Sequence, residues 1–286
     1  RFLQRLDKYA VKTVEPLVAL RLGHAKHLGD QFLDGVLLED DQYEVQPFGD
    51  TRKRAVTLYG VWSDARAYGR EVVNNSKGCG GVMRVAPVGI YGTVHGWPIA
   101  KTAAVAGEIA ELTHSHPHST YASAALAVIV QQCLCADHVD REVFKTIVSE
   151  ALKTVGEIYG ESDHMMKLFK KIIEEAVRLS GLRREGWPDY SIIELCIGAG
   201  WVAEETLAIA IFSVLLYIDD FDSCIVCAVN HGGDSDSTGA VAGNIIGTIV
   251  GYDAIPQKFT IPLQLRYLML DMADKLSSSW KVLSYF

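Results

Sequence analysis

The sequence predicts an all-α fold, in which many helices pack into one compact domain spanning residues 1–286. Six segments carry apolar residues at intervals of three and four positions, the period of an amphipathic helix, whereas the alternation typical of strands is scarce. Apolar residues make up 49% of the chain and charged residues 22%, enough to bury a large core. No linker-like or low-complexity stretch divides the chain, so we expect a single domain.

The six periodic segments predict helices over 101–113, 119–136, 141–158, 163–180, 200–217 and 262–276. Asp140 and either Ser162 or Asp163 stand where N-caps belong, and Gly160 and Gly181 stand where helices end. Loops are expected over 72–89, 112–123, 180–191 and 230–237. Residues 1–70 are atypical, because charged and apolar residues are mixed there and follow no clear helical or strand period. We expect short helices and loops in this segment.

The bulk composition excludes several classes of function. A net charge of -8 argues against direct nucleic-acid binding, which needs clustered lysine and arginine. Neither a membrane span of about 20 apolar residues nor a signal peptide is recognisable, so a cytoplasmic protein without a membrane partner is expected. Cys224 and Cys227 form a lone C-x-x-C on an apolar helix and are interpreted as buried thiols. The oligomeric state stays open.

An acidic stretch near the end of the chain, Asn230 to Gly247 (NHGGDSDSTGAVAGNIIG), carries the clearest chemical signal. Asp234 and Asp236 lie close enough to repel each other in water, and a divalent cation removes that penalty. Carboxylate and hydroxyl oxygens are the ligands that magnesium, calcium and manganese prefer. These oxygens come from five consecutive residues: Asp234, Ser235, Asp236, Ser237 and Thr238.

This stretch has three other interpretations. An EF-hand loop fails, because it requires a glutamate where this chain has Ile245. An aspartyl-phosphate phosphatase would carry its first aspartate at the end of a buried strand, which does not suit a helical chain. A simple helix cap remains open, since Asp and Ser are strong N-cap residues, although one cap needs only one of them.

The helix expected after this stretch carries glycines at every fourth position: Gly239, Gly243, Gly247 and Gly251. Each glycine inside a helix costs up to about 1 kcal/mol relative to alanine. Such a stripe lets another helix, or a ligand, come close to the backbone. We therefore expect a buried central helix with the acidic stretch at its N-terminus.

Four stretches in this order resemble the ADP-ribosylglycohydrolase family: NNSKGCGGVMRVAPVG, LTHSHPHSTYASAAL, GAGWVAEETLAIAIF and NHGGDSDSTGAVAGNIIG. The resemblance implies an all-α fold of that type and a hydrolase that cleaves ADP-ribose at its anomeric carbon. It implies a pair of magnesium ions, with manganese as an alternative. Asp234, Asp236 and Ser237 match the family's late metal motif, and serine at 237 keeps the hydroxyl of the more usual threonine.

The same resemblance implies residues that hold the substrate. Gly78, Gly80 and Gly81 would let backbone amides approach ADP-ribose, with a plain turn as the alternative. Three residues at a helix N-terminus would hold an anion, with plain capping as the alternative: Ser119, Thr120 and Tyr121. Arg84 is expected in a structural ion pair, with a phosphate clamp as the alternative.

The remaining polar residues of these stretches receive structural interpretations. The spacing of His114, His116 and His118 directs them apart, so no metal cluster is expected. The resemblance gives three residues of the third stretch packing or helix-surface roles: Trp201, Glu204 and Glu205.

The family's early metal motif and early acidic residue have no plain match before residue 72. Candidates are Glu39 as the catalytic base and Asp40 and Asp41 as metal ligands, with Gly29-Asp30 and Asp50-Thr51 as further options and a solvated acidic loop as the alternative. We therefore expect the start of the chain to be divergent or truncated.

We expect a metal-dependent hydrolase that removes ADP-ribose from a protein side chain or a small molecule. Asp234 and Asp236 would hold the cation against the ribose, and Glu39 would act as base. The alternatives are a weak or inactive relative that only binds ADP-ribose, and a structural helical protein with a vestigial site. The late carboxylates, Asp234 and Asp236, support the hydrolase. The lack of a recognisable early metal motif supports the two alternatives.

Overall fold

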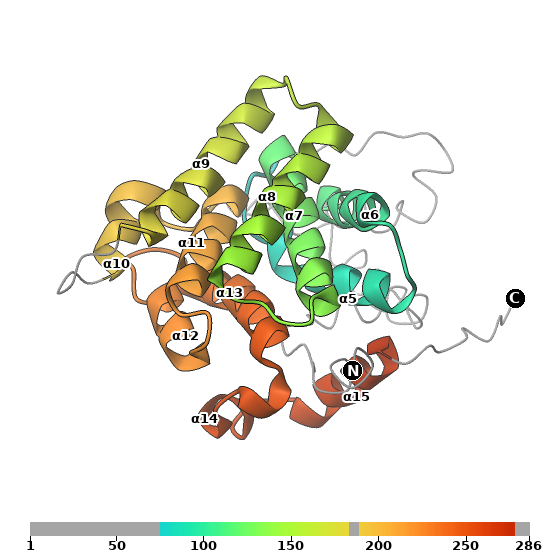
Figure 1. Ribbon diagram of the computed structural model, residues 1–286, viewed down its shortest axis with the longest axis vertical. Coiled ribbons are helices and arrows are strands. Elements are labelled where there is room, and N and C mark those ends of the chain that lie inside the picture. The colour runs from blue at the N-terminus through green and yellow to red at the C-terminus, as the bar shows by residue number, and fades with distance from the viewer. Residues whose placement is uncertain (1–74, 183–188, 278–286) are drawn as a thin grey trace, which may run out of the picture.

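The computed structural model describes residues 75–182 and 189–277, and the regular elements within these ranges are helices (Figure 1). No strand occurs in the described part of the chain; an antiparallel bridge joins Gly78 to Val202 there. The prediction of an all-α fold is therefore confirmed. The expected single domain over residues 1–286 stays a prediction.

The first half of the described chain contains one 3₁₀ turn and five α-helices. Their bounds are η1 Val82–Arg84, α5 Ala86–Val94, α6 Ile99–Glu111, α7 Pro117–Cys135, α8 Arg141–Tyr159 and α9 His164–Ser180. The helices predicted over 101–113, 119–136, 141–158 and 163–180 correspond to α6 through α9. The loop predicted over 72–89 was wrong at its end, because Ala86 already begins α5 with Pro87 in its first turn, where proline is tolerated.

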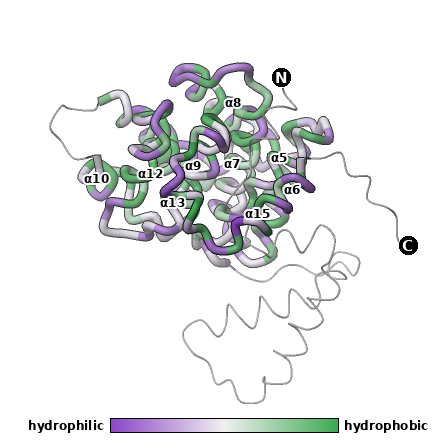
Figure 2. Tube along the Cα trace, turned by 90° about the horizontal axis from the view of Figure 1, so that it is seen from below, coloured by the Kyte–Doolittle hydropathy of each residue, from purple (hydrophilic) through white to green (hydrophobic). Residues whose placement is uncertain are grey.

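The second half begins after residue 188. Its elements are α10 Asp189–Ile192, the π-helical turn η2 Ile193–Ile197, α11 Ala203–Leu216, α12 Phe221–Val229, α13 Ser235–Val250, η3 Tyr252–Ala254, α14 Gln257–Thr260 and α15 Arg266–Ser277. The helices predicted over 200–217 and 262–276 correspond to α11 and α15. Figure 2 shows hydrophilic and hydrophobic stretches alternating along outer helices such as α15, as a helix with one solvated face requires.

The core is built around α7 and α11. Almost every residue of both helices is buried, and their sequences are apolar on all sides, which is typical of a helix surrounded by others. Helices α5, α6 and α8 pack on α7, whereas α9, α12 and α13 pack on α11. The expectation that the glycine-rich helix α13 would be the central one was wrong: it packs against α11, α12 and α7, with several residues only half-buried.

The glycine stripe of α13 faces α12. A Cβ atom at Gly239 would lie 2.7 Å from Val229 Cγ1, and one at Gly243 would lie 3.7 Å from Ile225 Cδ1. The stripe thus admits a neighbouring helix, which is one of the two expected uses. Gly251 lies just beyond the helix, where its φ of 82° ends α13.

The predicted caps are mostly confirmed. Asp140 accepts hydrogen bonds from the amides of Glu142 and Val143, both at 2.9 Å. Asp163, rather than Ser162, caps α9. Gly160 ends α8 with a φ of 103°.

Two further expectations concern burial and membranes. Cys224 and Cys227 are 0% and 5% exposed, so the prediction of buried thiols is confirmed. Of the helices that the structure describes, none combines the length and the apolar character that a membrane crossing requires.

Candidate functional site

Three segments that are far apart in the sequence meet at the candidate site: residues 75–81, residues 198–203 and residues 230–237. The amide of Ala203 donates to the carbonyl of Lys77 at 3.0 Å, next to the bridge between Gly78 and Val202. On the other side, the amide of Asp234 donates to the carbonyl of Ala199 at 2.8 Å. Residues 198–203 therefore connect the glycine loop to the acidic turn.

The acidic turn, residues 230–237, brings the predicted metal ligands together. The carboxylate of Asp234 is 6% exposed, and the Cys79 thiol donates to its Oδ2 at 3.0 Å. The same thiol lies 3.2 Å from the Ser237 hydroxyl. Asp236 is exposed and lies close to Asp234. Asp234 stands at the N-cap position of α13, and the Ser237 amide of the first turn is among the groups that lower the pKa of its carboxyl, so the alternative of a simple cap stays open.

The charges of this turn follow from its contacts. Burial opposes ionisation of Asp234, but the hydrogen bonds from Cys79 and Ser237 outweigh it and hold the pKa of the carboxyl below its ordinary value. Burial and the neighbouring Asp234 raise the pKa of the Cys79 thiol to about 11. At neutral pH the site thus holds an ionised carboxylate and a protonated thiol that donates to it.

A histidine that the sequence analysis did not single out shapes the turn. His231 Nδ1 accepts a hydrogen bond from the Gly233 amide at 3.1 Å, so Nε2 carries the ring proton and donates to Thr238 Oγ1 at 3.0 Å. Thr238 in turn donates to the carbonyl of Ala228 at 2.7 Å. Only glycine fits at position 233, because a Cβ atom there would lie 1.8 Å from the carbonyl oxygen of Ala199.

The glycine loop, residues 75–81, packs against His114, which precedes α7, and against Ser119 in the first turn of α7. A Cβ atom at Gly80 would lie 2.7 Å from His114 Cε1, and one at Gly81 would lie 2.7 Å from Ser119 Oγ. These glycines therefore have a packing reason that the sequence did not reveal. Burial, together with the charge of Arg84, lowers the pKa of His114 to about 4, so the ring is neutral where it touches the loop. The roles of Gly78, Gly80 and Gly81 as substrate contacts stay predictions.

Arg84 supports the loop from behind. Its guanidinium donates to the carbonyl of Ile109 at 2.9 Å, to that of Ala110 at 3.4 Å and to the hydroxyl of Thr113. Cations stabilise the C-terminus of a helix, where carbonyls lack helical partners. Arg84 thus binds the end of α6 through hydrogen bonds, and its expected role in a structural ion pair stays a prediction.

The residues predicted to hold an anion lie in the first turn of α7. The amides of Ser119 and Thr120 both bond to the carbonyl of His116, at 2.9 and 3.2 Å. The side chains of Ser119, Thr120 and Tyr121 are only 0%, 2% and 6% exposed. The Ser119 hydroxyl finds no hydrogen-bond partner among the described residues. A role for these three residues as substrate contacts stays a prediction, and the Ser119 hydroxyl lies buried against Gly81.

Glu204 is a buried charged residue that the sequence analysis had assigned to packing or the helix surface. It is 4% exposed, and its Oε1 pairs with Lys77 Nζ and, at 2.9 Å, with His118 Nδ1. His118 Nε2 also lies 3.0 Å from the carbonyl of Met165. Burial opposes ionisation of Glu204, but the hydrogen bonds from His118 and Lys77 hold its pKa below the ordinary value. This ion cluster ties the glycine loop to α7, α9 and α11.

The neighbours of Glu204 differ from each other. Glu205 accepts a hydrogen bond from the Gly200 amide at 3.0 Å and so orders the segment before α11. Trp201, by contrast, leaves 62% of its surface exposed, which fits the surface role rather than the packing role of the two that were expected. The sequence places this tryptophan beside two motifs, but only the structure shows that it is exposed.

The oxygen donors of the acidic turn suit a hard divalent cation in chemical type. Asp234, Asp236 and Ser237 supply two carboxylates and a hydroxyl, whereas magnesium takes about six oxygen ligands, some of them water. Within residues 75–182 and 189–277, no group of three or more histidine, cysteine or acidic side chains is placed to hold a metal ion. The predicted early ligands Asp40 and Asp41 and the predicted base Glu39 lie outside the described residues.

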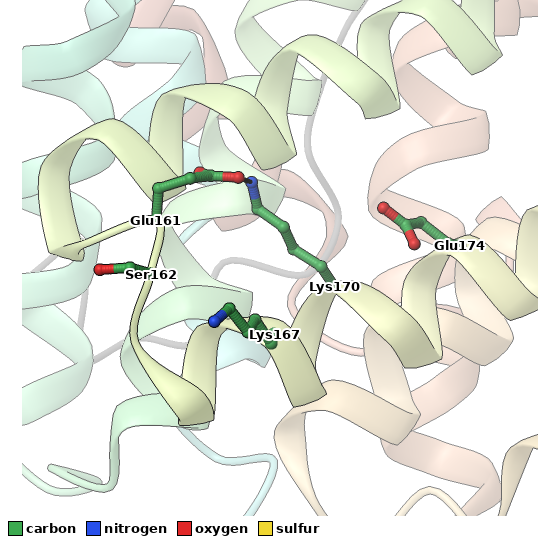
Figure 3. A pocket seen from close by; sticks show the side chains of 5 residues that line it. All are labelled: Glu161, Ser162, Lys167, Lys170 and Glu174. Carbon is green, nitrogen blue, oxygen red and sulfur yellow. Dashed lines mark hydrogen bonds and ion pairs between the residues drawn. The ribbon is translucent and has the colours of Figure 1, made fainter.

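A surface hollow of about 570 Å³ lies away from these segments, at the turn between α8 and α9 (Figure 3). Its lining consists of charged or polar side chains: Glu161, Ser162, Lys167, Lys170 and Glu174. Lys170 Nζ donates to both oxygens of Glu161, at 2.5 and 2.6 Å, which neutralises its charge. None of the predicted site residues lines this hollow, and we assign it no role in the chemistry.

Comparisons with known proteins bear on the four motifs. The family model for ADP-ribosylglycohydrolase matches residues 13–283. An uncharacterised protein of Archaeoglobus fulgidus is 27% identical over 198 residues, which span 69% of this chain and 57% of that relative. The ADP-ribosyl-[dinitrogen reductase] glycohydrolase of Rhodospirillum rubrum is 44% identical over 48 residues, which span 17% of this chain and 16% of that enzyme.

A solved structure, named as an ADP-ribosylglycohydrolase-related protein complex, superimposes with a TM-score of 0.57. The match covers 96% of this chain and 95% of the other at 21% sequence identity, so it shows a shared fold. The family match covers most of the chain, including the glycine loop and the acidic turn. By this match, the chain belongs to the ADP-ribosylglycohydrolase family.

Proposed function

We propose that this protein hydrolyses the bond between the anomeric carbon of ADP-ribose and an acceptor, which is a protein side chain or a small molecule. One observation carries the proposal: the ionised carboxylate of Asp234 and the hydroxyl of Ser237 converge, with Cys79 at 3.0 and 3.2 Å, where the glycine loop meets the acidic turn. Family membership supports the class of reaction, and the oxygen donors support a divalent cation, magnesium or manganese.

Asp234, Asp236 and Ser237 would hold the cation, which would supply positive charge to orient the ribose hydroxyls and to stabilise charge that develops during hydrolysis. The residues of the chain do the rest. Glycine-loop amides and the Ser119 hydroxyl hold the diphosphate, and Glu39 takes a proton from the attacking water. The water oxygen bonds to the anomeric carbon as the bond to the acceptor breaks, and the acceptor leaves with a proton.

The test uses the full chain with ADP-ribosylarginine or an ADP-ribosylated protein in magnesium buffer, and chromatography to measure free ADP-ribose. We expect release that stops when a chelator removes the cation and returns when magnesium or manganese is added. Asp236→Ala should abolish release, whereas Asp274→Ala, an exposed aspartate on α15, should not. Release that is equal in the wild type and Asp236→Ala would contradict the proposal.

A second candidate is a protein that binds ADP-ribose without cleaving it. One observation favours it: the described residues bring only one acidic turn to the site, and the early metal ligands have no recognisable motif. Binding of ADP-ribose to the wild type without any release would support this candidate. We also propose that the protein is cytoplasmic and that the chain forms a single domain.

A further inference from the structure

Cys79 is a residue of the glycine loop whose side chain contacts the acidic turn. Its sulfur atom lies 3.0 Å from Asp234 Oδ2 and 3.2 Å from the Ser237 hydroxyl, although 155 and 158 residues separate it from them in the sequence. An ionised carboxylate has no proton to donate, so the thiol is the donor in its hydrogen bond to Asp234. One side chain of the loop therefore contacts two of the three proposed cation ligands.

The backbone on both sides of Cys79 is held by the fold. Before it, Gly78 forms the antiparallel bridge with Val202. After it, Gly80 packs so closely on His114 that a Cβ atom there would lie 2.7 Å from the ring. A cysteine side chain has a single torsion between its heavy atoms, so a fixed backbone leaves the thiol few other positions. The loop thus presents the thiol to the acidic turn at little cost in conformational entropy.

The acidic turn is held from another side through its backbone. The Asp234 amide donates to the carbonyl of Ala199 at 2.8 Å, and Gly233 packs directly on the same carbonyl. These contacts fix the backbone of the turn, but they do not reach the oxygen atoms of the Asp234 carboxylate. The orientation of that carboxylate depends instead on the groups that bond to its oxygens, among them the Cys79 thiol and Ser237.

We propose that Cys79 is a positioning residue whose thiol orients the Asp234 carboxylate for a divalent cation; this rests on the cation site of the proposed function. A carboxylate that rotates freely must be ordered when it binds a metal ion, and that ordering lowers the affinity. Loss of a hydrogen-bond partner of a metal ligand commonly weakens metal binding by about 10- to 100-fold. Magnesium prefers oxygen ligands to sulfur, so Cys79 acts through Asp234 and does not bind the cation itself.

The first arm of the test measures magnesium binding to the full chain by calorimetric titration, in the absence of substrate. Two variants lack the donor and differ in volume, Cys79→Ala and Cys79→Val, whereas Cys79→Ser keeps a donor. The matched control is Cys135→Ala, which changes an exposed cysteine at the end of α7. We expect both donor-free variants to raise the Kd for magnesium about 10-fold, and Cys79→Ser to stay within about threefold of the wild type. Cys135→Ala should leave the Kd unchanged.

The second arm separates positioning from a role in stability. Urea titration of the metal-free proteins should give cooperative unfolding of every variant, with midpoints that do not follow the order of the magnesium affinities. Magnesium should raise the unfolding temperature of the wild type and of Cys79→Ser more than that of Cys79→Ala, because stabilisation by a ligand follows its affinity. Unfolding midpoints that fall in proportion to the affinities would show a structural role and overturn the inference.

The third arm measures release of ADP-ribose from ADP-ribosylarginine at increasing magnesium concentrations. The concentration that gives half-maximal release should rise in Cys79→Ala by about the same factor as the Kd. If the wild type binds magnesium and releases ADP-ribose, but the donor-free variants bind magnesium equally well, the inference fails and the proposed function stands. The inference also fails if Cys79→Ser loses as much affinity as Cys79→Ala.

Two further results separate the inference from the proposed function. If magnesium binding depends on Cys79 as expected but the wild type releases no ADP-ribose, the inference stands and the proposed hydrolysis fails. If the wild type binds no magnesium, the inference and the cation site of the proposed function fail together.

Discussion

Glu204 and the pair formed by Asp234 and Asp236 place carboxylates near the same glycine loop, but their surroundings differ. Glu204 is ion-paired with Lys77, a cation of this chain, and hydrogen-bonded to the His118 ring. Among the described residues, no lysine or arginine forms an ion pair with Asp234 or Asp236. The partners of Asp234 are instead the Cys79 thiol, the Ser237 hydroxyl and the second carboxylate.

This difference is the one that we propose between a structural carboxylate and a metal-binding one. A buried carboxylate with its own cations is already neutralised, and it orders the backbone that it connects. Two neighbouring carboxylates without such cations remain repulsive, and a divalent cation from solution relieves that repulsion. Opposite results are therefore expected when each acid is changed to its amide.

The largest effect is expected at Asp236. Asp236→Asn should lower magnesium-dependent release of ADP-ribose by about 100-fold or more, because it removes one cation ligand. Without a cation, the same change should alter the free energy of unfolding by less than about 1 kcal/mol, since the lost helix-dipole interaction and the relieved repulsion oppose each other. Initial rates and urea titrations measure the two quantities. A loss of stability without a loss of activity would reverse the comparison.

The next effect is expected at Glu204. Glu204→Gln should lower the free energy of unfolding by about 3 kcal/mol, because it leaves His118 and Lys77 without their counter-ion. Urea titration measures the change, with Glu142→Gln as control, because that exposed glutamate pairs with Lys145 at the surface. Equal stabilities of Glu204→Gln and Glu142→Gln would show that the cluster is not a structural one.

His114 extends the comparison to a buried base. Burial and Arg84 lower its pKa to about 4, below the ordinary 6.5, so the unfolded chain takes up a proton in that interval and the folded chain does not. The stability contributed by neutral His114 is therefore complete above about pH 6.5 and is lost as the pH falls towards 4. The ring proton signals, assigned with a His114→Gln variant, should titrate near pH 4. Titration near pH 6.5 would contradict the burial of this ring.

The smallest effect concerns the helix that carries the acidic turn. Gly243→Ala should raise the free energy of unfolding by about 0.5–1 kcal/mol, because the nearest atom to the new methyl group is 3.7 Å away and alanine favours a helix. Gly239→Ala is the matched control, since its methyl group would lie 2.7 Å from Val229 and should destabilise. Thermal unfolding separates the two. If both substitutions changed the free energy of unfolding in the same direction, α12 would not limit the size of the side chains on this face of α13.

The helices could be predicted because their signals are local. Asp140 caps α8 through the two amides that follow it, and the apolar period of residues 141–158 needs no tertiary information. The first residues of α5 fell within the loop predicted over 72–89, where Pro87 and Gly89 are residue types typical of loops, and Gly92 follows in the same helix. In the structure the two glycines allow close packing, for a Cβ atom at Gly89 would lie 2.4 Å from the carbonyl oxygen of Ala127.

The site could be predicted only in part, for a related reason. Asp234 and Ser237 are neighbours in one turn, so the sequence alone indicated that they share a role. Cys79 lies 155 residues away from Asp234, and only the fold brings them together. The pairing of Glu204 with His118 was hidden in the same way, because 86 residues separate them. Glu39, Asp40 and Asp41 stay predictions.

The most direct test of the central claim is calorimetric titration of the full chain with magnesium. The account predicts saturable binding to the wild type that Asp236→Asn abolishes, together with an increase in the unfolding temperature of the wild type alone. Absence of magnesium binding to the wild type, or equal binding to Asp236→Asn, would contradict the claim that the acidic turn is completed by a divalent cation.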